Sequence, residues 1–178
     1  MGIVKNLFIC LPLVLSAGLA HAQDGTAMRN TFYVGGGQAI TDDPLKNDDT
    51  PFSIGFMHRV AEKDLVLGFD LAGEGTKLDS TWGMDNNLSQ GISFNLLVGA
   101  NLIDTGRFRT EAALLVGLRQ TSADCPDSYL GYQCYADFPP DVAYRANFGG
   151  VITMSFDKVL LGLRATGEST QLLAGIRF

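Results

Sequence analysis

The final stretch of the chain, Ser169–Phe178, reads STQLLAGIRF and alternates residue by residue between two faces. A pattern with a period of two predicts a β-strand. One face is apolar and the other carries polar groups and a charge, as in a strand between lipid and a wet lumen. The apolar face comprises Thr170, Leu172, Ala174, Ile176 and Phe178, and the opposite face comprises Ser169, Gln171, Leu173, Gly175 and Arg177.

The other end of the chain predicts export. Lys5 precedes an apolar run, Leu7–Leu19, that is too short to span a bilayer as a helix. Ala20-His21-Ala22 has the small-x-small pattern of a signal-peptidase site. We therefore expect a signal peptide at residues 1–22 and one domain at residues 23–178. An exported chain with no later apolar helix is either soluble or a β-barrel of the outer membrane.

The net charge and the cysteines limit which ligands and which cysteine sites the chain can have. The formal net charge of −6 argues against nucleic-acid binding, which needs a basic surface. Cys125 and Cys134 follow the signal peptide, and an even pair in an exported chain predicts a disulfide. The alternative, a zinc site, is weak because the pair has no nearby histidine. We expect no metal and no other cofactor.

Alternating runs predict eight antiparallel strands between turn signals. A tilted membrane strand needs about 9–11 residues, so residues 23–178 accommodate eight of them with their loops. The fold class is therefore all-β, an eight-stranded antiparallel up-and-down transmembrane barrel. The expected strands are Asn30–Ala39, Phe52–Val60, Asp64–Glu74, Gly91–Asn101, Arg107–Thr121, Val142–Phe156, Val159–Thr166 and Ser169–Phe178.

The connections between these strands alternate in length. The segments 41–50, 75–90 and 122–141 are long, whereas 61–63, 102–106 and 157–158 are tight turns. Only the short connection at 167–168 departs from the alternation. Long loops at one end and tight turns at the other are the asymmetry of outer-membrane barrels.

Each expected strand has an apolar face that we expect to point outward. On Arg107–Thr121, for example, Leu114, Val116 and Leu118 oppose Arg109 and Glu111. The aromatic residues group near the two ends of the strands, as membrane girdles do. A soluble barrel of the lipocalin kind, with the apolar faces inside, is the alternative. The aromatics expected near the tight turns are Phe32, Phe108, Phe156 and Phe178, and those near the long loops are Phe52, Phe94 and Tyr144.

With these features the chain resembles the small eight-stranded outer-membrane barrels, the OmpA/OmpX-like group. The resemblance rests on the export signal, the opening run Asn30–Gly37, the alternation of loop lengths and the terminal Phe178. It implies a location in the bacterial outer membrane, contact with lipids including lipopolysaccharide, and a monomeric state. It also implies that periplasmic chaperones and the barrel-assembly machinery act on the chain, with Ile176 and Phe178 in the assembly signal.

Charged residues on the inward faces form the first candidate site. A barrel of eight strands is just wide enough to be filled by side chains, so opposite charges inside it must pair. We expect a polar plug, and a narrow path for small anions is the alternative. The expected lumen network comprises Arg59, Asp70, Glu74, Arg109, Glu111, Arg119, Arg145 and Arg164, with Arg107 and Arg177 also pointing inward.

Catalysis and surface binding are the other possibilities. Some small outer-membrane barrels modify lipid A, which requires a nucleophile beside a base. His58 is the one histidine after the signal peptide, and it lacks such a serine on its face, so we expect no enzyme. The long loops are rich in aspartate, which suits a solvated rim or divalent cations. Aromatics near Cys125 and Cys134 favour surface contacts. We therefore expect a structural or surface-interaction role.

Overall fold

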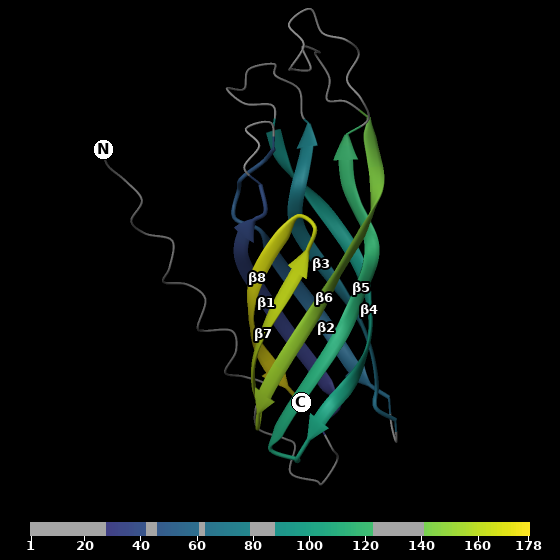
Figure 1. The fold of residues 1–178 in the computed structure, drawn as a ribbon, viewed down its shortest axis with the longest axis vertical. Helices are drawn as coiled ribbons and strands as arrows, with labels where there is room; N and C mark the ends of the chain where they lie inside the picture. Colours follow the sequence, from purple (N-terminus) through teal and green to yellow (C-terminus); the bar gives the residue numbers. More distant parts are fainter. Residues whose placement is uncertain (1–27, 42–45, 61–62, 79–87, 123–140) are drawn as a thin grey trace, which may run out of the picture.

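The computed structural model describes residues 28–41, 46–60, 63–78, 88–122 and 141–178. These residues form a closed barrel in which each strand is antiparallel to its chain neighbours and β1 pairs with β8 (Figure 1). The expected fold, an all-β eight-stranded antiparallel barrel, is confirmed. The strands are β1 (Asn30–Ala39), β2 (Phe52–Arg59), β3 (Leu65–Leu78), β4 (Leu88–Asp104), β5 (Phe108–Ser122), β6 (Val142–Phe156), β7 (Val159–Thr166) and β8 (Ser169–Arg177).

The largest difference from the sequence prediction is the length of β3 and β4. Both continue beyond Gly75, which adopts a positive φ of 72° within an irregularity between Gly73 and Thr76. Past this bulge the pairing resumes, from Thr76 opposite Gln90 to Leu78 opposite Leu88. A bulge interrupts the alternation, because one extra residue shifts the side chains to the other face. The polar segment after Gly75 was therefore expected to be a loop.

The two ends of the barrel differ. The tight turns between β2 and β3, β4 and β5, and β6 and β7 lie at the end where β8 finishes, here called the turn end. The turn between β7 and β8 lies at the opposite end, called the loop end. There β3, β4, β5 and β6 reach well beyond the β7–β8 turn (Figure 1). The barrel wall is therefore higher on one side than on the other. We call the upper part of β3, β4, β5 and β6 the raised sheet, and the side that ends at the β7–β8 turn the low wall.

The outer surface of the barrel is apolar and its interior is polar in large part. The outward side chains of β4 include Phe94, Leu96 and Val98, each more than half exposed. Inward positions hold buried charged groups such as Asp70 and Arg164. The lipocalin-like alternative is therefore wrong, since it requires the reverse arrangement. None of the described residues forms a helix long and apolar enough to cross a membrane.

The barrel closes at a seam between its first and last strands. Nine residue pairs register β1 against β8, from Thr31 opposite Arg177 to Ala39 opposite Ser169. At the turn end the backbones of Asn30 and Phe178 exchange two hydrogen bonds, with N···O distances of 2.8 and 2.9 Å. Phe178 thus completes the last pair of the seam, and the described strands leave no unpaired edge in this half of the barrel.

Candidate functional site

The loop-end half of the lumen is organised around Arg164 on β7. Its guanidinium lies between two carboxylates of β3, with Nη2 at 2.9 Å from Asp70 Oδ1 and 2.8 Å from Glu74 Oε1. All three side chains are fully buried, at 0% exposure. A buried ion pair is stable only when its geometry is good and its remaining polar atoms are satisfied. We call Arg164, Asp70, Glu74 and their hydrogen-bond partners the Arg164 cluster.

Both carboxylates of the Arg164 cluster receive further donors from other strands. The Tyr33 hydroxyl donates to Asp70 Oδ2 at 2.9 Å, and Asn95 Nδ2 donates to Asp70 Oδ1 at 2.8 Å. Every carboxylate oxygen therefore accepts at least two hydrogen bonds, which compensates for the loss of water. The donors to Glu74 are Ser93, Asn147, Thr166 and Ser169, with distances of 2.7 to 2.9 Å.

Arg119 lies across the loop-end mouth of the barrel. It extends from β5 to the β7–β8 turn, where Nη2 donates to Glu168 Oε1 at 2.6 Å. Gly75 is favoured by its positive φ, and a Cβ atom there would lie only 2.6 Å from Arg119 Nη1, so that the end of the Arg119 side chain would have to move. The Arg119–Glu168 pair connects the raised sheet to the low wall.

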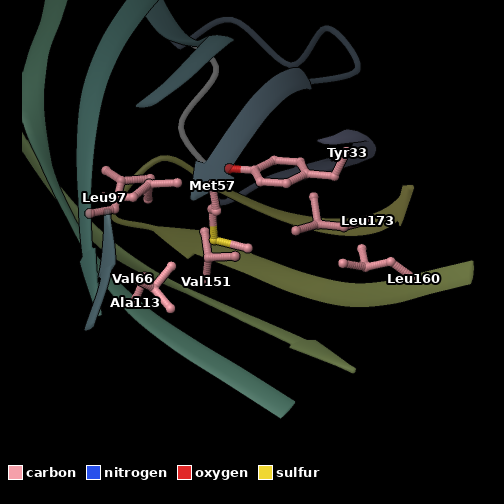
Figure 2. Close-up of a cluster of buried hydrophobic side chains, with 9 residues drawn as sticks. Tyr33, Met57, Val66, Leu97, Ala113, Val151, Leu160 and Leu173 are labelled. Atoms are coloured by element: carbon pink, nitrogen blue, oxygen red, sulfur yellow. The ribbon is translucent and has the colours of Figure 1, made fainter. Parts of the chain in front are cut away.

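A layer of apolar side chains crosses the middle of the lumen (Figure 2). All eight strands contribute to it, so it forms a complete layer rather than a patch on one wall. Its side chains are at most 6% exposed, and it separates the charged residues of the Arg164 cluster from those at the turn end. Tyr33 belongs to both the layer and the cluster, because its ring lies in the layer and its hydroxyl donates to Asp70. The layer, here called the apolar layer, comprises Tyr33, Met57, Val66, Leu97, Ala113, Leu115, Val151, Leu160 and Leu173.

A second charged group, the turn-end cluster, lies beyond the apolar layer. Asp104 accepts hydrogen bonds from both Arg59 and Arg109, at 3.1 Å from Arg109 Nη2. Glu111 Oε1 lies 3.8 Å from Arg109 Nη1, and the same Nη1 donates to the Met28 carbonyl at 2.7 Å. The segment before β1 is thereby held against the barrel mouth. The expected single network is thus two networks with an apolar layer between them.

Two arginines expected inside the lumen lie elsewhere. Arg145 is on the inward-facing side of β6 but above the β7–β8 turn, so its side chain is exposed and has no ion pair among the described residues. It lies directly opposite Arg119 on β5. Arg107 precedes β5 in its turn and is 75% exposed, with its guanidinium over the Phe156 ring. An inward position in the alternation therefore predicts a buried side chain only at heights where strands enclose the lumen on all sides.

The remaining candidates do not assemble a reactive centre. The His58 ring lies on the outer surface, with Nδ1 2.8 Å from Asn30 Oδ1. No group of three or more potential metal ligands occurs among the described residues. Cys125 and Cys134 lie outside the described residues, as do the signal peptide and most of the loop aspartates. The predicted disulfide and the predicted acidic rim therefore stay predictions.

The sequence pattern did not reveal the uncharged residues of the Arg164 cluster or the members of the apolar layer. Ser93, Asn95, Asn147, Thr166 and Ser169 satisfy the buried carboxylates, yet isolated polar residues on a strand give no signal of their role. The apolar layer was missed because each strand contributes only one or two members. Inward apolar residues such as Met57 and Leu160 are visible in the alternation, but only the register shows that they lie at one height.

No protein-family model and no curated protein matches this sequence. Among solved structures, the chain is similar to Ail, the attachment invasion locus protein of Yersinia pestis, in complex with the heparin analogue sucrose octasulfate. That comparison gives 13% identity and a TM-score of 0.50, and covers 84% of this chain and 98% of that chain. The chain has the fold of an outer-membrane barrel. The expected resemblance to small eight-stranded outer-membrane barrels is thereby confirmed for the fold.

A second structure, of the Yersinia pestis outer membrane protein Ail in a phospholipid bilayer nanodisc, gives 12% identity and a TM-score of 0.43, and covers 84% of this chain and 99% of that chain.

Proposed function

We propose that this protein spans the bacterial outer membrane as a monomeric barrel with no path through it, and that it acts through surface contacts rather than catalysis. The apolar layer supports the closed lumen, because a dry constriction excludes water and ions. The apolar outer surface supports insertion, since exposed Leu, Val and Phe side chains on every side of a closed barrel suit lipid.

The unpaired edge of the raised sheet carries the proposed surface role. β6 pairs with β5 along its whole length, but with β7 only from Gly149 to Phe156. Val142–Phe148 therefore presents backbone donors and acceptors that no described strand pairs. The opposite edge, on β3, is partly covered, because Asn47 N donates to Thr76 Oγ1 at 2.8 Å. An edge with no partner strand among the described residues suits the addition of an extended strand from a partner protein.

Insertion is tested first, by mobility on a denaturing gel of unheated and boiled samples from separated membrane and soluble fractions. We expect a membrane-bound band that shifts on boiling, since folded barrels resist the detergent. A band in the soluble fraction that does not shift would contradict the proposed location, and with it the expected contacts with lipopolysaccharide, chaperones and the assembly machinery.

The surface role is tested by attachment of a non-adherent bacterial host to cultured cells. Expression of the wild type should raise attachment above the empty vector. Val142→Lys with Ala146→Lys should lower it, because lysines on an exposed edge oppose strand addition. Leu78→Lys on the covered β3 edge is the matched control. Attachment equal to the empty vector would contradict the surface role and leave the barrel placement standing.

A second candidate ligand is a sulfated sugar. Arg119 and Arg145 are directly opposite on neighbouring strands. Glu168 pairs with Arg119, whereas Arg145 is exposed, has no ion pair among the described residues and offers its guanidinium to an external anion. The Ail structure described above was solved with a heparin analogue. Retention on immobilised heparin should fall for Arg145→Gln at moderate salt. Unchanged retention, or none for the wild type, would remove this candidate.

A further inference from the structure

The two ends of the barrel carry opposite charge. In the sequence of the three long connections, 40–51, 79–87 and 123–141, Lys46 is the one basic residue among many aspartates. At the turn end, the described residues have seven basic side chains against four acidic ones, and Glu62 adds a fifth acidic residue in the sequence of the β2–β3 connection. The basic ones are Arg29, Arg59, Lys63, Arg107, Arg109, Lys158 and Arg177, and the acidic ones are Asp64, Asp104, Glu111 and Asp157.

Arg107 is a cation on the outside of this rim that forms a two-point ion pair with Asp157. Its Nε and Nη2 donate to the two carboxylate oxygens of Asp157, each at 3.2 Å. The Asp157 amide in turn donates to the Arg107 carbonyl at 2.7 Å. The hydrogen bonds and charge of Arg107 hold the pKa of Asp157 below its usual range, so the pair is ionised at neutral pH. Arg107 Nη1 has no hydrogen-bond partner among the described residues.

The fixed guanidinium lies at the border between polar rim and apolar wall. Its Cζ atom is 5.2 Å from the centre of the Phe156 ring, and Phe156 is an outward aromatic that is 58% exposed. Lys158 follows Asp157 directly and is exposed, and the next residue, Val159, is an outward apolar side chain. Two cations thus flank one carboxylate immediately above a surface suited to acyl chains, and the local charge is positive.

We propose that Arg107 and Lys158 bind the phosphate of an anionic phospholipid headgroup at the turn end, with the acyl chains against Phe156 and Val159. A free guanidinium N–H group and a flexible ammonium are both donors suited to phosphate oxygens. Long cationic side chains also reach from the apolar boundary into the headgroup layer. This inference rests on the proposed placement of the barrel in a bilayer.

Native mass spectrometry of the full mature chain, folded in detergent, tests the site. Phosphatidylglycerol and phosphatidylcholine with identical acyl chains are added separately, and bound lipids are counted. We expect at least threefold higher occupancy for phosphatidylglycerol. The preference should vanish in Arg107→Gln with Lys158→Gln and persist in Lys46→Gln with Lys77→Gln, which removes two cations from the loop end. Lys158→Gln alone retains the Arg107–Asp157 pair and should lose part of the preference.

The proposal would be overturned if both lipids had equal occupancy on the wild type, or if the loop-end control variant lost the lipid preference to the same extent. It would also be overturned if equimolar glycerol 3-phosphate displaced phosphatidylglycerol, because the acyl chains would then contribute nothing to binding. Heat-modifiable mobility in vesicles of each lipid separates this failure from that of the proposed function. A barrel that inserts without lipid preference contradicts only the site, whereas a chain that inserts in neither vesicle contradicts the placement itself.

Discussion

Arg164 is the residue on which the loop-end half of the lumen depends. Among the described residues it is the one cation in contact with two buried carboxylates, Asp70 and Glu74. Its N–H groups connect β7 to these residues of β3 and to Ser169 at the start of β8. Removing one partner from a buried ion pair leaves an uncompensated charge, which costs more than the pair contributes. An uncharged side chain of similar size therefore cannot replace Arg164 without a loss of stability.

We expect Arg164→Met to lower the free energy of unfolding by about 3–5 kcal/mol, because both carboxylates lose their cation in a fully buried site. Urea titration of the folded barrel, read from the fraction of heat-modifiable band, measures the change. Arg145→Met is the matched control and should change stability by less than about 0.5 kcal/mol, since its side chain is exposed. Adding Asp70→Asn and Glu74→Gln to Arg164→Met should recover part of the loss. Equal effects of the two single variants would contradict the role of the cluster.

Phe178 is a second single residue on which the barrel depends, here through its backbone hydrogen bonds at the seam. Its N–H and carbonyl both bond to Asn30, while its ring is 52% exposed on the outer surface. Deleting Phe178 should reduce the amount of folded barrel in the outer membrane, because both seam hydrogen bonds and the aromatic are lost. Phe178→Ala retains the two hydrogen bonds and separates the contributions. Normal levels of folded protein after deletion would show that the terminus has no part in assembly.

At the scale of elements, β6 has two parts with different surroundings. Val151–Phe156 lies between β5 and β7, whereas Val142–Asn147 has only β5 beside it. In an antiparallel pair, alternate residues direct their N–H groups to opposite sides. Every second amide of the upper part therefore has no partner strand among the described residues.

Hydrogen exchange should reveal this difference. We expect alternate amides within Val142–Asn147 to exchange at least a hundredfold faster than the amides of Val151–Phe156, since an unbonded N–H exchanges without opening the barrel. Residue-resolved exchange measured by NMR in detergent micelles gives the rates, and the lower part of β6 is the internal control. Uniform protection along β6 would mean that the edge is covered, and it would remove the support for strand addition.

At the scale of the whole molecule, the lumen has three layers: charged, apolar and charged. An ion crossing the barrel would have to leave the Arg164 cluster, pass the apolar layer without water, and enter the turn-end cluster. We expect the cost of an unpaired charge in an apolar environment to close this path to ions. The narrow anion channel is therefore the weaker alternative, although arginines occur at both ends.

The wild type should give no stable conductance steps in a planar bilayer. Leu97→Ser with Leu115→Ser, which replaces neighbouring members of the apolar layer, should introduce small steps by admitting water. Leu96→Ser with Leu114→Ser changes the same strands on their outer face and is the control. Steps from the wild type would show that the lumen conducts, and silence of the layer variant in a folded barrel would show that another layer closes it.

Alternation by itself predicted eight strands and separated the apolar face of each strand from its polar face, because a period of two is a local property of a strand. Whether the apolar faces point outward, or inward as in a lipocalin-like barrel, was decided only by the closed structure. β1, β6 and β7 match their predicted bounds, whereas the bulge at Gly75 concealed the upper ends of β3 and β4. Only the closed register decided what meets inside. Arg164 is 94 residues from Asp70 and 90 residues from Glu74 in the chain. The height at which two inward side chains meet depends on the stagger of all eight strands. For the same reason the structure alone placed Arg145 above the low wall, Arg107 outside the lumen and the apolar layer across its middle.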